Sequence, residues 1–125
     1  MPLADKGVLI IDDECLIADY VATVLEEEGI AVAGTAATAA EARVMFNELQ
    51  PSALVCDIRL GADDGIELAR ELRAKRDIPV IFVSGFGDQS VLDRVDGLAP
   101  AGFLQKPVLP QRLVQAVRAM LADAA

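Results

Sequence analysis

The stretch Gly7-Val8-Leu9-Ile10-Ile11-Asp12-Asp13-Glu14 decides the fold of this chain. Its unbroken run of apolar, mainly β-branched residues is typical of a strand that is buried on both faces, as in a parallel sheet. Three acidic residues stand where that strand ends. The stretch therefore predicts a central strand that delivers carboxylates to one edge of a sheet.

The rest of the chain alternates further apolar runs with helical patterns. A capping box from Thr38 to Glu41 marks one helix start, and Gly29 and Pro110 mark a helix end and a helix start. After the first strand, we expect strands at 30–35, 53–57, 79–84 and 102–105, and helices at 15–28, 38–50, 64–75, 88–96 and from 110 onward.

This alternation predicts an α/β fold, because strand and helix follow each other five times. Such a pattern favours a flavodoxin-like, doubly wound (βα)5 three-layer sandwich with a parallel sheet in the order 2-1-3-4-5. We expect residues 1–125 to form a single domain without an effector domain, since 125 residues leave no room for a second one.

Composition excludes several classes of protein. The net charge of −9 argues against direct binding to DNA or to an anionic membrane. The chain has no histidine, which excludes imidazole-based triads and any phosphohistidine on this chain. The apolar runs are too short to span a membrane and no signal peptide is evident, so we expect a cytoplasmic protein.

The two cysteines, Cys15 and Cys56, are too few for a disulfide scaffold or a zinc site. We expect both to be small buried residues. The helical spacing after Cys15 likewise predicts that Leu16 and Ile17 belong to the apolar face of the first helix.

Polar residues stand at the ends of four predicted strands. Asp12 and its acidic neighbours follow the first strand, Asp57 and Ser84 end the third and fourth, and Lys106 follows the fifth. Each alone is consistent with a helix cap or a turn. Because ligands bind beyond the carboxyl ends of the strands in such sheets, the four together predict a site.

The residue types in this set favour phosphoryl chemistry with a magnesium ion. Clustered carboxylates repel one another, and Mg²⁺ removes that repulsion while accepting oxygen ligands. With the ion bound, one carboxylate can attack phosphorus, while Lys106 offsets charge on the phosphoryl oxygens and Ser84 donates a hydrogen bond to the product. The acidic loop after the first strand argues against a flavin or dinucleotide phosphate there.

The set of residues resembles the receiver domain of two-component response regulators, in a CheY-like single-domain form. The resemblance covers essentially the whole chain and rests on Asp12-Asp13-Glu14, Asp57, Ser84-Gly85 and Lys106-Pro107 in that order. It implies that Asp57 accepts a phosphoryl group from a phosphohistidine of a partner histidine kinase or histidine phosphotransfer protein.

The same resemblance implies roles for the neighbouring residues. Mg²⁺ would be held by Asp12, Asp13, Asp57 and the backbone carbonyl of Arg59. Lys106 would pair with the phosphoryl group and Ser84 would be the switch hydroxyl. Phe103 stands at the switch aromatic position, where Tyr is frequent, and a cis peptide bond is implied before Pro107.

The resemblance also implies a signalling role rather than an enzyme with an external substrate. Such a domain assists its own phosphorylation and dephosphorylation, and then changes an output face made by the helix at 88–96, the fifth strand and the last helix. We expect an unknown downstream protein as its target, possible homodimerisation through that face, and neither DNA nor membrane as a direct partner.

Three hypotheses stay open. The first is a receiver, either stand-alone or excised from a hybrid histidine kinase or a longer regulator. A small Mg²⁺-dependent phosphohydrolase with an Asp nucleophile is a further reading, although its usual Asp-x-Asp pattern and cap domain are missing. The third is an atypical receiver that signals without phosphate, against which the full set of site residues argues.

Overall fold

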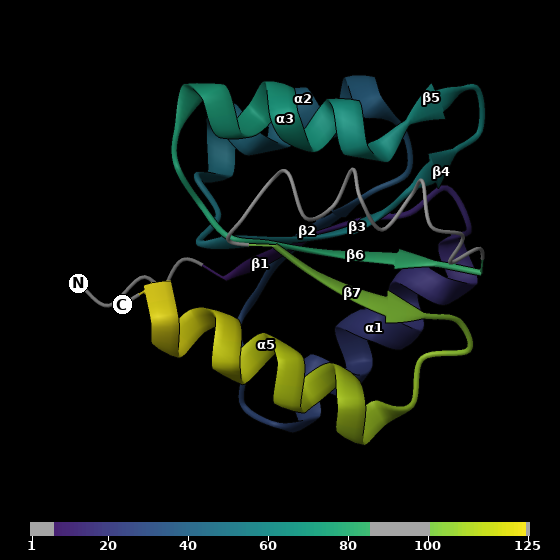
Figure 1. Cartoon of the computed structure of the whole chain (residues 1–125), viewed down its shortest axis with the longest axis vertical. Helices are drawn as coiled ribbons and strands as arrows, with labels where there is room; N and C mark the ends of the chain where they lie inside the picture. The colour runs from purple at the N-terminus through teal and green to yellow at the C-terminus, as the bar shows by residue number, and fades with distance from the viewer. Residues whose placement is uncertain (1–6, 86–100, 125) are drawn as a thin grey trace.

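A five-stranded parallel sheet lies between two layers of helices in the computed structural model, which describes residues 7–85 and 101–124 (Figure 1). The strand order is β2-β1-β3-β6-β7. This order confirms the predicted doubly wound sheet. The strands are β1 (Val8–Ile11), β2 (Val32–Ala36), β3 (Ala53–Asp57), β6 (Val80–Ser84) and β7 (Ala101–Gln105).

Two helices cover each face of the sheet within the described residues (Figure 1). Helices α2 (Ala39–Leu49) and α3 (Gly65–Lys75) lie on one face, and α1 (Cys15–Glu27) and α5 (Pro110–Ala124) lie on the other. The helix expected at 88–96 lies outside the described residues. In the described part of the chain, no helix is long and apolar enough to cross a membrane.

Strand β1 supplies both cores, which explains its unbroken apolar run. Leu9 and Ile11 pack with the residues of α2 and α3, whereas Val8 and Ile10 pack with those of α1 and α5. All four side chains are buried because successive residues of a strand point to opposite faces. Strand β1 lies inside the sheet, between β2 and β3, with a helix layer on each face.

The helix caps that the sequence predicts are present, but in the capping box of α2 Glu41 pairs with the N–H of Ala37 and not with that of Thr38. Thr38 accepts a hydrogen bond from the backbone N–H of Glu41 over 3.1 Å, and Glu41 in turn accepts one from the N–H of Ala37. Asp64 accepts hydrogen bonds from the N–H groups of Ile66 and Glu67 at the start of α3. Short polar side chains therefore fix where α2 and α3 begin.

The prediction of burial was wrong for Cys15 and Leu16. Cys15 is exposed and Leu16 retains 84 % of its accessible surface. Leu16 is two positions from the buried Ala18, so it faces the opposite side of α1. Cys15 occupies the first position of α1, before the buried stripe begins.

A short hairpin after β3 escaped the sequence analysis. Strands β4 (Arg59–Leu60) and β5 (Asp63–Asp64) pair antiparallel, and the Leu60 side chain is buried. Elements of two residues leave no periodic pattern to detect. The second strand also differs, because β2 covers Val32–Ala36 in place of the expected 30–35.

Gly65 allows the chain to pass directly beside the end of β3. Its N–H donates to the carbonyl of Ile58 over 2.6 Å, and a Cβ at this position would collide with the carbonyl oxygen of Asp57. The close approach thus requires glycine at the start of α3.

We expect Gly65→Ala to destabilise the protein by about 1–3 kcal/mol, because the added methyl group must displace the backbone of Asp57. Urea denaturation measures this loss. Gly102→Ala is the matched control, since a Cβ there meets the Ile81 side chain at an ordinary 3.5 Å. Equal effects of the two variants would contradict the close approach.

Candidate functional site

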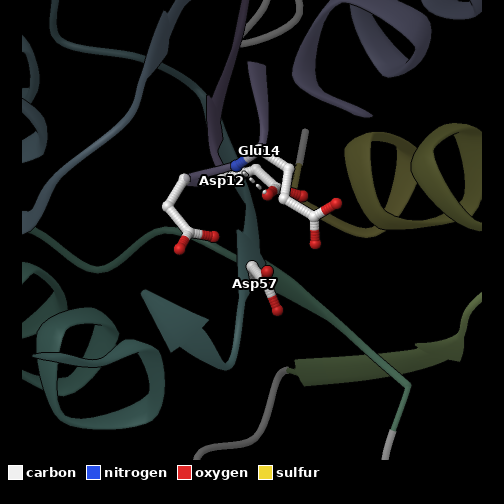
Figure 2. Close-up of side chains that lie close together, drawn as sticks. Asp12, Glu14 and Asp57 are labelled. Atoms are coloured by element: carbon white, nitrogen blue, oxygen red, sulfur yellow. Dashed lines mark hydrogen bonds between the residues drawn. The ribbon is translucent and has the colours of Figure 1, made fainter. Parts of the chain in front are cut away.

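Four carboxylates gather where β1 and β3 end. Asp12 follows β1 directly and Asp57 ends the neighbouring strand β3. One carboxylate oxygen from each of Asp12, Asp13, Glu14 and Asp57 lies within 4.8 Å of the others. Figure 2 shows that Asp12 and Glu14 approach Asp57 from the segment after β1. Asp12 and Asp57 are buried, while Asp13 and Glu14 are exposed.

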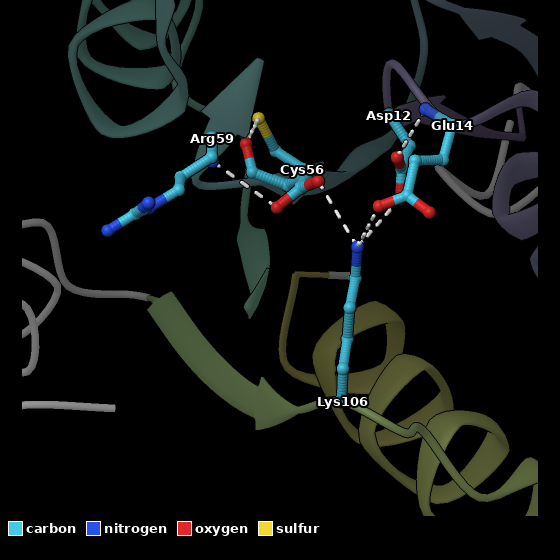
Figure 3. Close-up of polar contacts among 6 residues, drawn as sticks. Asp12, Glu14, Cys56, Arg59 and Lys106 are labelled. Atoms are coloured by element: carbon cyan, nitrogen blue, oxygen red, sulfur yellow. Dashed lines mark hydrogen bonds and ion pairs between the residues drawn. The ribbon is translucent and has the colours of Figure 1, made fainter. Parts of the chain in front are cut away.

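Lys106 extends from the segment after β7 into this acidic cluster. Its Nζ lies 3.2 Å from Asp57 Oδ2, 3.4 Å from Asp12 Oδ2 and 3.8 Å from Glu14 Oε1 (Figure 3). The ammonium thus stands between carboxylates from two strands. Since carboxylates outnumber it, the cluster keeps an excess of negative charge.

Backbone groups orient the two buried carboxylates. Asp12 Oδ1 accepts a hydrogen bond from the N–H of Glu14 over 2.9 Å, and Asp57 Oδ1 accepts one from the N–H of Arg59 over 3.3 Å. These bonds turn the Oδ2 atom of each carboxylate toward Lys106 (Figure 3). The facing arrangement is therefore built into the turns that follow β1 and β3.

Burial and charge shift the pKa values of two groups in the cluster. Burial raises the pKa of Asp12, and the negative charge of Asp57 adds to the rise, although the N–H of Glu14 opposes it. Burial lowers the pKa of Lys106, but Asp57 and Asp12 outweigh that effect, so its pKa lies above the ordinary value. Lys106 is consequently charged at neutral pH.

Cys56 lies beneath the site and takes no part in its chemistry. Its buried thiol donates to the carbonyl oxygen of Asp57 over 3.4 Å. Burial raises the pKa of this thiol, and the charge of Asp57 raises it further. The neutral thiol is thus a packing group and not a nucleophile, and the prediction that Cys56 is buried is confirmed.

Ser84 and Phe103 occupy the adjoining strands. Ser84 is a buried residue that ends β6, the strand next to β3, and its carbonyl accepts a hydrogen bond from the N–H of Lys106 over 2.9 Å. Phe103 pairs with Phe82 between β7 and β6 and packs, half-buried, against the core under α2 and α3. The peptide bond between Lys106 and Pro107 is cis.

The structure brings together Asp12, Asp13, Asp57 and Lys106, which the strand ends predicted. It also brings Glu14 into the cluster, which the sequence analysis placed in the same acidic stretch but did not name as a metal ligand. The signal for Glu14 was its place beside the acidic pair. The proximity of Gly65 to Asp57 had no signal in the sequence alone, because it depends on how the hairpin returns.

Comparisons with known proteins point in one direction. The family described as the response regulator receiver domain matches residues 8–118. A probable transcriptional regulator, ycf27, of Cyanophora paradoxa is 34 % identical over 97 % of this chain and 50 % of its own length. The transcriptional regulatory protein PdtaR of Mycobacterium tuberculosis is 30 % identical over 90 % of this chain and 55 % of its own length.

Solved structures agree with these sequence matches. The signal receiver domain of a modulated diguanylate cyclase from Desulfovibrio desulfuricans aligns with a TM-score of 0.84, 33 % identity and 94 % coverage of both chains. A CheY-like receiver domain protein from Methanospirillum hungatei aligns with a TM-score of 0.85, 28 % identity and 94 % coverage of both chains. The chain spans about half the length of the curated relatives it matches.

We expect Asp13→Asn to raise the melting temperature in Mg²⁺-free buffer by about 2–5 °C, because it removes one charge from a cluster of like charges. The same variant should gain less than the wild type from saturating Mg²⁺, since it offers one carboxylate fewer to a cation. Differential scanning calorimetry with and without Mg²⁺ measures both effects.

Glu48→Gln provides the control for net charge, because Glu48 is exposed on α2 and lies outside the cluster. It should leave the response to Mg²⁺ unchanged. If Asp13→Asn and Glu48→Gln behaved alike, the cluster would not be the metal site.

Proposed function

Because the chain belongs to the family of response regulator receiver domains, we propose that it accepts a phosphoryl group on Asp57 and transmits the signal to a partner protein. The observation that carries this proposal is the place of Asp57: buried at the end of β3, inside the acidic cluster, with Oδ2 3.2 Å from Lys106 Nζ. A carboxylate held in that way is a suitable nucleophile toward phosphorus.

The proposed reaction is a transfer from nitrogen to oxygen. Asp57 Oδ2 attacks the phosphorus of a phosphohistidine, a phosphorus–oxygen bond forms, and the phosphorus–nitrogen bond breaks. The departing imidazole nitrogen keeps the electron pair and takes up a proton. These 125 residues hold no histidine, so the phosphohistidine donor lies outside them, on a histidine kinase or a histidine phosphotransfer protein.

Mg²⁺ fits the residues at this site. The donors are carboxylate oxygens, which a hard cation prefers, and Lys106 alone does not balance their charge. We assign the ion to Asp12, Asp13, Asp57 and the backbone carbonyl of Arg59. When bound, Mg²⁺ would offset negative charge on the carboxylates and on the phosphoryl oxygens.

Lys106 and Ser84 would respond to the new phosphoryl group. Lys106 Nζ already faces Asp57 Oδ2, so it can pair with a phosphoryl oxygen placed there. Ser84 ends the strand beside β3, so this residue lies at the same edge of the sheet as Asp57. We propose that Ser84 moves to donate a hydrogen bond to the phosphoryl group and that Phe103 turns inward with it.

The output face would include β7 and α5. Phe103 and Lys106 line a hollow on this face together with Leu109 and Arg112, so changes at the site reach the surface there. Its target would be a downstream protein or a second copy of the chain. The net charge of −9 argues against DNA or anionic membrane as a direct partner, and we propose a cytoplasmic location.

In this proposal the chain is a phosphoacceptor and not an enzyme with an external substrate. Its residues assist the gain and the loss of its own phosphoryl group. Any activity of a longer protein that carries these residues would belong to its other parts.

We expect Asp57→Asn to abolish phosphorylation, because the amide lacks the nucleophilic carboxylate oxygen. Incubation with Mg²⁺ and acetyl phosphate, followed by intact-mass spectrometry, should show a gain of one phosphoryl group in the wild type and none in the variant. Asp77→Asn is the control, since Asp77 is an exposed carboxylate in the loop that follows α3.

A mass gain that persists in Asp57→Asn would overturn the assignment of the acceptor. Rapid release of inorganic phosphate without any phosphorylated protein would instead support the phosphohydrolase.

A further inference from the structure

One hydrogen bond ties α1 to the segment that carries Lys106. The Tyr20 hydroxyl donates to the carbonyl oxygen of Val108 over 3.0 Å, although the two residues are 88 positions apart. Tyr20 lies in the second turn of α1, and Val108 lies between β7 and α5. Figure 1 shows α1 and α5 on the same face of the sheet. The hydroxyl therefore joins two elements that flank the acidic cluster.

Among the described residues, backbone hydrogen bonds hold both ends of the segment 106–109 and a side-chain hydroxyl holds its middle. The N–H of Lys106 donates to the carbonyl of Ser84, and the carbonyl of Leu109 accepts from the N–H of Leu113 where α5 begins. Between these contacts, Pro107 has no N–H to donate. The bond from Tyr20 to Val108 fixes the middle of the segment.

The position of this segment determines what Lys106 reaches. Its Nζ contacts three carboxylates over 3.2 to 3.8 Å, and the closest contact is to Asp57 Oδ2. Figure 3 shows the Lys106 side chain extended toward the carboxylates, so its reach depends on where its backbone is held. A displacement of about 1 Å would take the contact with Asp57 beyond hydrogen-bond range.

We infer that Tyr20 is a positioning residue for Lys106. Its hydroxyl fixes Val108 and thereby the backbone from which Lys106 reaches Asp57. The inference rests on the proposed function of Asp57 and Lys106 and extends it to α1. Tyr20 donates to the carbonyl of Val108 and would act on the reacting atoms only through it.

Tyr20 could instead serve only to hold α1 and α5 together. Arg118 provides a matched control for that role, because it also links the two helices. Arg118 Nη2, from α5, donates to the carbonyl and to the Oε1 of Glu28, over 3.1 and 3.3 Å. Glu28 caps the end of α1, whereas Tyr20 lies near its start. Loss of the Arg118 contacts loosens the same two helices without moving Val108.

The first measurement is the rate constant for phosphorylation at saturating Mg²⁺ and acetyl phosphate. Tyr20→Phe removes only the hydroxyl, and we expect a fall of about three- to tenfold, the factor that corresponds to one neutral hydrogen bond. Arg118→Gln should keep the wild-type rate constant. Thermal denaturation of both variants separates this effect from a loss of stability.

The second measurement repeats Tyr20→Phe in a Lys106→Met background. If Tyr20 acts through Lys106, it should have no further effect there. The inference is overturned if Tyr20→Phe leaves the wild-type rate constant unchanged, or if it lowers the rate constant by the same factor in both backgrounds.

Failure of the proposed function has a different signature. A Lys106→Met variant that is phosphorylated at the wild-type rate would remove the role of Lys106, and with it the role of Tyr20. Phosphorylation that persists in Asp57→Asn would show instead that the acceptor is misassigned.

Discussion

Within the described residues, four carboxylates and the ammonium group of Lys106 lie together at one edge of the sheet, and this imbalance of charge governs the chemistry of the site. Two of the carboxylates, Asp12 and Asp57, are buried, where repulsion between like charges is strongest. Burial raises the pKa of Asp12, so its ionised form is held at a cost. The excess negative charge favours a divalent cation, and a cation at the site in turn favours the arrival of a phosphoryl group.

Rigid neighbours keep the like charges together. Strands β1 and β3 are buried along their whole length and pair with each other, so Asp12 and Asp57 cannot move apart without disturbing both cores. Gly65 lets the chain return past Asp57, and the N–H of Arg59 holds one oxygen of its carboxylate. The fold thus keeps the two carboxylates close together although their charges repel each other.

Much of this site could be predicted because the carboxyl ends of parallel strands lie at the same edge of a sheet. The apolar run of β1 and the polar residue after each strand were enough to predict that Asp12, Asp57 and Lys106 converge. Spacing alone did not show that Leu16 faces away from the core, nor that two-residue strands pair after β3. No local pattern relates residues 88 positions apart, so the contact of Tyr20 with Val108 appears only in the folded chain.

The most direct test of the phosphoacceptor is phosphorus-31 NMR of the intact protein with Mg²⁺ and acetyl phosphate. A buried aspartate that serves as acceptor predicts one protein-bound acyl phosphate resonance, which requires Mg²⁺ and disappears on addition of hydroxylamine. A protein-bound resonance that resists hydroxylamine, or consumption of the donor with no protein-bound resonance at all, would contradict it.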